Sequence, residues 1–235
     1  MLIGAMHYDF KMKYNKLDSQ FNRNFLVPEI DWLLNESAKL FVSWIAEPRT
    51  KKLLGFETSQ RNIDDISTIV VSPENTFTTV TNNVATLPID YWYFTKGIVK
   101  ASKGKCIDKL GRLYIVQHDD MTEESSMYKS SFEWREFNAY CFNNGIRFLT
   151  DGSFTVNAVC LSYIRKMVYM HNAQAYLAGG YTSPDGVALI GSVNCELPET
   201  THSEIVDIAV VLASTSTQTS NYQQLLNKLN LNQIT

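Results

Sequence analysis

The chain has 235 residues, enough to bury a good core in one domain or in one domain with an extension. Hydrophobic residues make up 45% of the sequence and charged residues 19%, which excludes an intrinsically disordered protein. The net charge of -3 gives no chain-wide electrostatic reason to bind nucleic acid.

The N-terminal residues 1–27 are expected to form an arm or a short helix. Within them, residues 8–22 place Tyr8, Phe10, Tyr14, Leu17 and Phe21 roughly in helical register. The next segment, residues 26–47, carries more apolar and aromatic surface than a solvated helix needs.

Residues 26–47 predict one amphipathic helix, with Pro28 in its first turn and Pro48 at its end. Glu29 and Asp31 suit the positive end of the helix dipole. Trp32 falls on the face opposite the apolar stripe. That stripe, at 3.6-residue spacing, consists of Ile30, Leu33, Leu34, Leu40, Phe41, Trp44 and Ile45. One face is therefore expected to build a core and the other to meet a neighbouring subunit.

The middle of the chain changes to strand patterns. β-Branched and aromatic residues are enriched in short runs bounded by turn residues. The expected strands are residues 67–72, 76–81, 91–101, 112–116, 138–142, 146–149 and 154–170. Asn143–Asn144–Gly145 is a hairpin turn sequence that tolerates positive φ. Because turns join the strands, the sequence predicts an α+β fold with a mainly antiparallel sheet rather than βαβ units.

Two irregular segments interrupt the strands. Residues 117–136 form an acidic loop containing Asp119, Asp120, Glu123 and Glu124. A loop of this length in a compact domain is usually functional. Residues 171–195 are glycine-rich and predict an extended excursion with a turn at Pro184–Asp185–Gly186. Phe132 and Trp134, at the end of the acidic loop, are not expected to remain in water together.

The C-terminal part is expected to be helical over residues 198–213. Its apolar residues cover most of the helix circumference, which implies burial on more than one side. Residues 214–220 are expected to be a polar linker. Tyr222, Leu225, Leu226 and Leu229 then predict a short amphipathic helix. The expected organisation is an arm over 1–27, one α+β core domain over 28–213 with helices beside the sheet, and a C-terminal extension over 214–235.

The aromatic run at residues 91–94 has two interpretations of equal weight. Strand alternation would place Tyr91 and Tyr93 on one face and Trp92 and Phe94 on the other. The strand is then either buried on both faces or part of an interface. Base stacking in a single-strand binder would need nearby positive charge. Lysines at 96, 100, 103, 105 and 109 supply some, although such lysines more often discourage aberrant pairing at sheet edges.

The sequence contains few residues in patterns typical of catalytic sites. His118 beside Asp119 and Asp120 could seed a metal site, but a solvated acidic loop explains the three residues more simply. The chain contains no G-x-S-x-G and no phosphate-binding glycine loop. Four separated cysteines contain no C-x-x-C pair, so no metal is expected and the thiols are expected to stay reduced. We expect no enzyme activity, no cofactor and no catalytic or metal-binding residues.

No segment has the roughly 18–20 apolar residues of a membrane span, and the N-terminus lacks the pattern of a secretory signal. We therefore expect a cytoplasmic product that does not contact a membrane.

Four segments between about Asn15 and Ala213 carry a resemblance to a known family: NKLDSQFNRNFLVPEIDWLLNESAKLFV, ATLPIDYWYF, IRFLTDGSFTVNAVCLSYIRK and CELPETTHSEIVDIAVVLAS. Together they resemble the neck and head–tail connector (ring or adaptor) proteins of tailed bacteriophages, most closely those of crAss-like phages of Bacteroidetes hosts. The most specific parts are the E-I-D-W-L-L-N-E helix and the L-P-E-x-T-H-x-E-I-V-D-I-A helix. The glycine-rich residues 179–191 are where this chain departs from the pattern.

The resemblance implies a virion structural protein, assembled in the host cytoplasm. It implies a homo-oligomeric ring, typically twelvefold, between the portal and the adjacent neck or tail proteins. DNA would pass through the lumen without sequence-specific binding. The apolar helical flanks are expected to be sealed by sister copies. The candidate subunit contacts are Trp32, Trp44, Tyr91, Trp92, Phe132, Trp134, Tyr222, Leu225, Leu226 and Leu229. The alternatives are a nucleic-acid-binding module and, less favoured, a small metal-dependent hydrolase.

Overall fold

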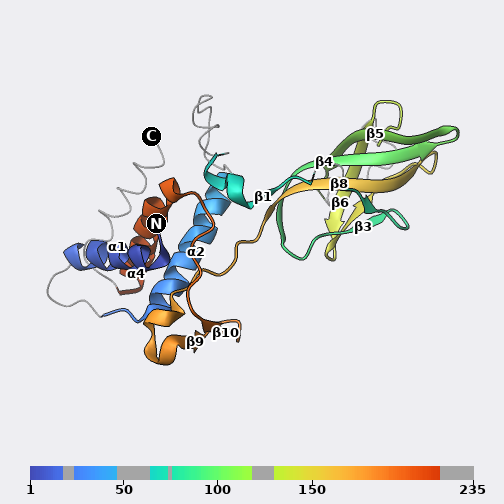
Figure 1. Cartoon of the computed structure of the whole chain (residues 1–235). Helices are drawn as coiled ribbons and strands as arrows, with labels where there is room; N and C mark the ends of the chain where they lie inside the picture. Colours follow the sequence, from blue (N-terminus) through green and yellow to red (C-terminus); the bar gives the residue numbers. More distant parts are fainter. Residues whose placement is uncertain (18–23, 47–63, 74–75, 118–129, 218–235) are drawn as a thin grey trace. The chain divides into compact units, whose positions relative to one another are not determined.

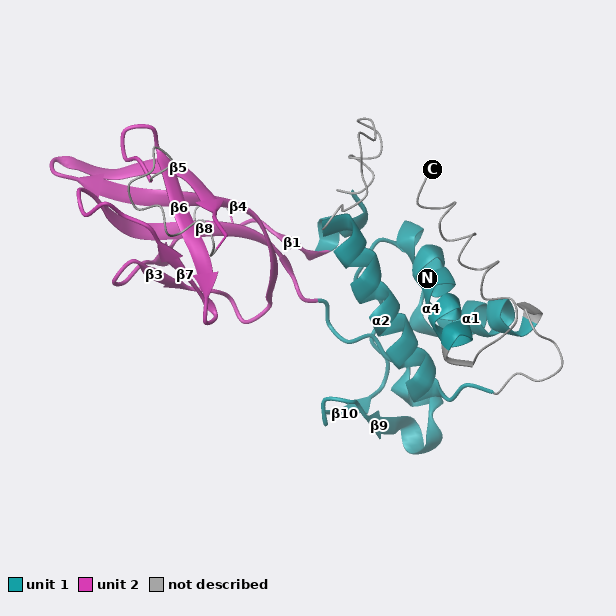
Figure 2. Cartoon of the chain, turned by 180° about the vertical axis from the view of Figure 1, so that it is seen from behind, with its two compact units in different colours: residues 1–68, 167–235 teal, residues 69–166 magenta. Residues whose placement is uncertain are grey.

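The computed structural model describes residues 1–17, 24–46, 64–73, 76–117 and 130–217 (Figure 1). The chain forms two compact units, shown in two colours in Figure 2. Unit 1 comprises Met1–Thr68 and Met167–Thr235, and unit 2 comprises Ile69–Lys166. The fold is α+β, with helices from both terminal regions and a mainly antiparallel sheet between them in sequence. The segment expected to form one core domain, residues 28–213, therefore contributes to both units.

Unit 1 is built on the helices α1 (Ile3–Leu17), α2 (Val27–Ala46) and α4 (His202–Thr217). Helix α4 packs against both α1 and α2 (Figure 1). The apolar stripe predicted for α2 is largely confirmed, because Ile30, Leu33, Leu34 and Phe41 are buried. The prediction that the C-terminal helix is buried on several sides is also confirmed: the buried residues of α4 include Ile205, Val206, Ile208, Ala209, Val210 and Val211. These apolar faces cover one another within a single chain.

Side-chain hydrogen bonds satisfy polar groups near the start of α2 and in the last turns of α4. At the start of α2, the Glu29 side chain accepts a hydrogen bond from the backbone N–H of Leu26 at 2.9 Å, which is one half of a capping box. Helix α4 continues to Thr217, so the linker expected from residue 214 begins later than predicted. The hydroxyls of Ser214 and Thr215 donate to the carbonyls of Val211 and Leu212 at 2.8 and 2.6 Å. Such bonds satisfy the hydroxyl groups of Ser and Thr side chains that lie within a helix.

The expected N-terminal arm is a helix that belongs to unit 1. Helix α1 begins at Ile3, earlier than the expected residues 8–22, because Ile3, Met6, Phe10 and Tyr14 form one buried face. Lys13 on α1 pairs with Asp207 on α4 at 3.0 Å. The N-terminal segment therefore contributes to the helical core.

The segment between the sheet and α4 is an irregular excursion, as predicted. It contains the 3-10 turns η3 (Ala173–Ala175) and η4 (Leu177–Gly179), then the antiparallel hairpin of β9 (Gly180–Thr182) and β10 (Ala188–Ile190). The turn at residues 184–186 is confirmed, with Gly186 at φ 80 and its N–H bonded to Ser183 O at 2.9 Å. The turn η5 (Glu199–Thr201) then leads into α4.

Unit 2 is an eight-stranded sheet in the order β1-β8-β4-β5-β6-β7-β3, with β2 paired to β8. A short 3-10 turn, η1 (Ser67–Ile69), precedes it. The strands are β1 (Val70–Val71), β2 (Thr78–Thr79), β3 (Val84–Thr86), β4 (Tyr91–Lys103), β5 (Cys106–Ile115), β6 (Glu136–Phe142), β7 (Gly145–Phe148) and β8 (Thr155–Arg165). The pairing of β5 with β6 is parallel, and the other pairs are antiparallel.

The predicted Asn143–Asn144–Gly145 turn joins β6 to β7. Asn143 and Asn144 have φ values of 40 and 55. Positive φ at both central residues is the hairpin geometry that asparagine tolerates best after glycine.

One face of the sheet encloses the core of unit 2. Buried side chains from its inner strands meet in one cluster, including Val99, Leu113, Phe137, Ile146 and Val159. Val80 and Ala85, from near the two ends of the strand order, join the same cluster. The sheet is therefore curled around its own core, which does not depend on the helices.

Candidate interaction surfaces

A buried polar cluster centred on Asp31 links helix α2 by hydrogen bonds to other segments of unit 1. The Asp31 carboxylate is fully buried and lies 2.7 Å from His7 Nε2. It accepts the hydroxyl of Tyr181 at 2.6 Å and the backbone N–H of Asn172 at 3.1 Å. Burial, followed by the bond to Asp31, raises the pKa of Tyr181 well above its usual range, so its hydroxyl stays protonated and donates.

Asn35, one turn further along α2, adds hydrogen bonds to this cluster. Its side-chain amide donates to the carbonyl of Met170 at 2.7 Å, and its side-chain oxygen accepts the N–H of Met170 at 3.0 Å. Asp31 and Asn35 thus tie α2 to α1, to residues 170–172 and to β9. Each of these bonds links parts of the fold, so we assign the cluster a structural role.

A second buried histidine lies at the start of α4. The Nε2 atom of His202 is 2.9 Å from the carbonyl of Leu197, and Nδ1 is 2.9 Å from the amino group of Met1. Burial lowers the pKa of His202, which favours the neutral ring. Neutral His202 can donate through Nε2 and accept through Nδ1, as both contacts require.

Three of the predicted contact residues are exposed tryptophans. Trp32 is 48% exposed on the face of α2 opposite the buried stripe, as its spacing predicted. Trp44, predicted as part of that stripe, is 39% exposed in the last turn of α2. Trp134 is 80% exposed in unit 2. Large aromatic side chains in water are frequent components of protein interfaces.

Phe132 cannot be a subunit contact in this fold. It is buried in the core of unit 2, and its ring centroid lies 6.2 Å from that of Phe154. As expected, Phe132 and Trp134 do not both remain in water, because Phe132 is buried while Trp134 is 80% exposed. Although they are only two residues apart, Phe132 is part of the unit 2 core and Trp134 is exposed to solvent.

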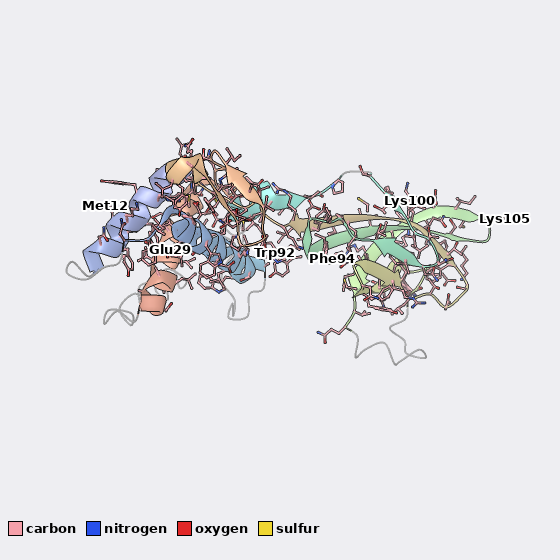
Figure 3. The ribbon with its side chains drawn as sticks, turned by 90° about the horizontal axis from the view of Figure 1, so that it is seen from below. Met12, Glu29, Trp92, Phe94, Lys100 and Lys105 are labelled. Carbon is pink, nitrogen blue, oxygen red and sulfur yellow. The ribbon has the colours of Figure 1, made fainter. Side chains whose placement is uncertain are left out.

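The aromatic run at the start of β4 does not alternate as predicted. Tyr91 and Phe94 both pack against the core of unit 2, while the rings of Trp92 and Tyr93 stack at 5.0 Å. Register shifts between Tyr91 and Tyr93, and between Phe94 and Lys96, explain the difference. A β-bulge inserts a residue and reverses the faces that follow it. Figure 3 labels Trp92 and Phe94 at this end of the strand.

Tyr91 and Trp92 are both half-buried. The ring of Tyr91 lies 5.7 Å from that of Tyr163, and burial is the main cause that raises the pKa of Tyr91 to about 12. Tyr91 therefore contributes mainly to the unit 2 core, and of the two only Trp92 remains a candidate contact.

The remaining predicted positions lie outside the described residues. These are the contacts Tyr222, Leu225, Leu226 and Leu229 and the candidate metal ligands His118, Asp119 and Asp120. Among the residues that the structure describes, no group of three or more His, Cys, Asp or Glu side chains could hold a metal ion.

The structure exposes apolar side chains that the sequence analysis missed. In unit 1, Leu177 and Ile190 are each 81% exposed, on η4 and on β10. In unit 2, Ile107 is 76% exposed near the β4–β5 turn. The run Val187–Ala188–Leu189–Ile190 is a signal that could have identified one of these sites, because alternate residues of an apolar run in a hairpin face outward.

The outer face of the sheet carries basic side chains on interior strands. Lys96, Ile98 and Lys100 alternate with core residues along β4, and Arg112 of β5 lies in register with Ile98. Strand β4 is paired on both sides, to β5 and to β8. The interpretation that Lys96 and Lys100 protect a sheet edge therefore does not apply.

No model of a known protein family matches this chain, and no curated protein sequence is significantly similar to it. None of the helices in the described ranges combines the length and the apolar character needed to cross a membrane.

Proposed function

We propose that this protein is a structural subunit of a virion, which assembles with copies of itself into a ring in the neck between portal and tail of a tailed bacteriophage. The observation that carries the proposal is the exposure of large apolar side chains on both units. Trp32 and Ile190 in unit 1 and Trp134 in unit 2 are between 48% and 81% exposed. Exposed aromatic and aliphatic side chains of this size are typical of surfaces that meet other proteins.

The burial of helix faces within the chain reduces the number of surfaces that a neighbouring subunit could contact. The buried residues of α2 and α4 cover each other within one chain, so these buried stripes are not the surfaces proposed for a sister copy. In unit 1 the surfaces that remain for contact are the opposite face of α2, around Trp32, and the outward residues of the β9–β10 hairpin, and in unit 2 the exposed Trp134 remains. A closed ring needs two different surfaces that meet at a fixed rotation.

The specific role rests on the resemblance to connector proteins. Its two most specific motifs lie in α2 and in η5–α4, helices that pack together in unit 1. Its T-D-G motif, residues 150–152, lies in the turn just before β8. The ring symmetry, the contacts with portal and neck or tail proteins, and the passage of DNA through the lumen belong to the proposal on this ground.

Light scattering coupled to size-exclusion chromatography tests self-assembly. The full chain, of 26.7 kDa, is expected to elute at a mass several times that value, increasing with concentration toward one limit. The variant Trp32→Ser should shift the distribution toward the monomer, whereas Tyr163→Phe, in the unit 2 core, serves as a matched aromatic control that should not. A mass of one chain at every concentration would reject self-assembly of the isolated protein.

A nucleic-acid-binding role is the second candidate, and the basic side chains on the outer sheet face favour it. A metal-dependent hydrolase is less supported, because its candidate ligands at residues 118–120 lie outside the described residues. Metal analysis of the purified protein tests that alternative: stoichiometric zinc or another transition metal would support it.

A further inference from the structure

We propose that the outer face of the unit 2 sheet binds the phosphate backbone of duplex DNA without reading its sequence. The site, called here the basic face, consists of Lys96 and Lys100 of β4 and Arg112 of β5. It does not require a ring, and it would exist in a single chain.

The charge of unit 2 differs from that of the whole chain. The net charge of the chain is -3, whereas residues 69–166 contain eleven basic and ten acidic side chains, a net charge of +1. Five of those acidic residues, Glu74, Asp119, Asp120, Glu123 and Glu124, lie outside the described residues, as does Lys129, so the described residues of unit 2 carry ten basic and five acidic side chains. The basic residues are Lys96, Lys100, Lys103, Lys105, Lys109, Arg112, Arg135, Arg147, Arg165 and Lys166. The acidic residues are Asp90, Asp108, Glu133, Glu136 and Asp151. A local excess of positive charge is the electrostatic footprint of a nucleic-acid surface.

The three cations of the basic face are spread over two neighbouring strands. Lys96 and Lys100 lie four residues apart on one side of β4, or about 13 Å along the strand. Arg112 is in register with Ile98, midway between them, on the neighbouring strand. Figure 3 shows Lys100 along the β4–β5 hairpin, with Lys105 toward the end of that hairpin, so positive charge continues in the same direction.

These charges are not neutralised in the described part of the chain. No ion pair there involves Lys96, Lys100 or Arg112, although Glu136 is in register with Arg112 on the next strand. The Lys100 ammonium lies 4.0 Å above the centre of the Phe77 ring, a cation–π contact that positions the charge without cancelling it. Leu110 and Tyr114, which are 51% and 42% exposed, lie two residues before and two residues after Arg112 and therefore on the same face of β5.

The arrangement favours a linear polyanion over a single anion. Its cations are spread along strands instead of converging on one point, and the structure places no buried donor among them. Lysine is a flexible point charge that suits contact with phosphate oxygens, and phosphate contacts carry no sequence information directly. Duplex DNA, with closely spaced phosphates along a stiff rod, is the ligand that fits such a row.

The test is fluorescence anisotropy of the full chain with a labelled duplex of mixed sequence, between about 50 and 200 mM salt. Binding should weaken steeply with salt. Replacing both lysines, Lys96→Gln with Lys100→Gln, should lower the affinity about tenfold or more and the log–log salt slope by about 2, because two phosphate contacts are lost. Adding Arg112→Gln should weaken binding further.

Two matched variants control the experiment. Lys11→Gln with Lys39→Gln removes the same charge from exposed positions of unit 1 and should leave binding unchanged. Lys96→Arg with Lys100→Arg keeps the charge and should retain binding. Circular dichroism on each variant checks that the sheet is folded.

Three outcomes of these measurements decide whether the basic face binds duplex DNA. Duplex affinity that is unchanged in the Lys96→Gln, Lys100→Gln variant, or undetectable at low salt, overturns the proposal. Tighter binding to a single strand of the same sequence also overturns it and assigns the face to single strands stacking on Tyr114. Light scattering on the same samples measures the oligomeric state independently of DNA binding. A monomer that binds duplex DNA through these lysines would refute ring formation and leave this inference standing.

Discussion

Asp31 and Tyr181, 150 positions apart in the sequence, meet inside unit 1, where the tyrosine hydroxyl donates to the carboxylate at 2.6 Å. The carboxylate is fully buried and would be costly to remove from water without its hydrogen bonds. This contact ties the glycine-rich excursion to the long helix α2. It makes the glycine-rich excursion an integral part of unit 1.

Removing the tyrosine hydroxyl should destabilise unit 1. Tyr181→Phe is expected to lower the free energy of unfolding by about 1.5–3 kcal/mol, the usual contribution of a hydrogen bond to a charged group. Urea unfolding followed by tryptophan fluorescence measures it. The control is Tyr8→Phe, because Tyr8 is 69% exposed on α1. Equal stability of Tyr181→Phe and the wild type would show that the bond contributes nothing.

His202 should make the stability of unit 1 depend on pH. Burial lowers its pKa in the folded state, so on acidification the unfolded chain binds a proton before the folded chain does. This contribution to stability is fully present above the unfolded pKa of about 6.5 and decreases as pH falls from there toward the lower folded value. His202→Gln should flatten the dependence of the unfolding free energy on pH between about 7 and 5. An identical slope in the variant would contradict this assignment.

Phe132 and Trp134 should respond oppositely to truncation. Phe132→Ala leaves a cavity in the unit 2 core and should cost about 3–5 kcal/mol of stability. Trp134→Ala changes an 80% exposed side chain and should alter stability by less than about 0.5 kcal/mol while weakening self-assembly. Thermal unfolding by circular dichroism and light scattering measure the two effects. A large stability loss in Trp134→Ala would remove it from the candidate contacts.

Gly111 should not tolerate a side chain. A Cβ atom there would meet the Phe137 ring and lie 2.5 Å from the carbonyl oxygen of Arg135, which is backbone and cannot move aside cheaply. Gly111→Ala should therefore destabilise unit 2 by more than about 1 kcal/mol. Gly4→Ala is the control, because its added Cβ lies 3.8 Å from the nearest atom and alanine favours a helix. A variant Gly111→Ala as stable as the wild type would be inconsistent with this close approach.

The C-terminal residues should contribute to assembly and not to folding. Helix α4 continues to Thr217, so the deletion that tests this should begin at residue 218. The truncated chain is expected to keep its circular dichroism spectrum and melting temperature, and to form smaller assemblies by light scattering. Assembly identical to that of the full chain would exclude this segment as a contact.

Local patterns in the sequence predicted local features well. The 3.6-residue spacing from Ile30 to Phe41 predicted α2 and its buried face, and the paired asparagines at 143–144 predicted the turn between β6 and β7. Each of these signals depends on neighbouring residues alone. The α+β class followed from the order of such elements.

Features that depend on distant partners could not be predicted. Asp31 was interpreted as a favourable charge near the start of a helix, whereas its main partners are His7, Asn172 and Tyr181. The faces of Tyr91–Phe94 depend on bulges against β8, which leave no clear mark in the strand itself. The burial of α4 by α1 and α2 also required the tertiary fold, and it removed the apolar flanks that had been expected to need sister copies.

Electron microscopy of the purified full chain tests the central claim most directly. The account predicts closed rings of one rotational symmetry, and Trp32→Ser should reduce their number. A field containing only single chains, both for the isolated protein and after incubation at high concentration, would contradict the assignment of this protein as a ring subunit.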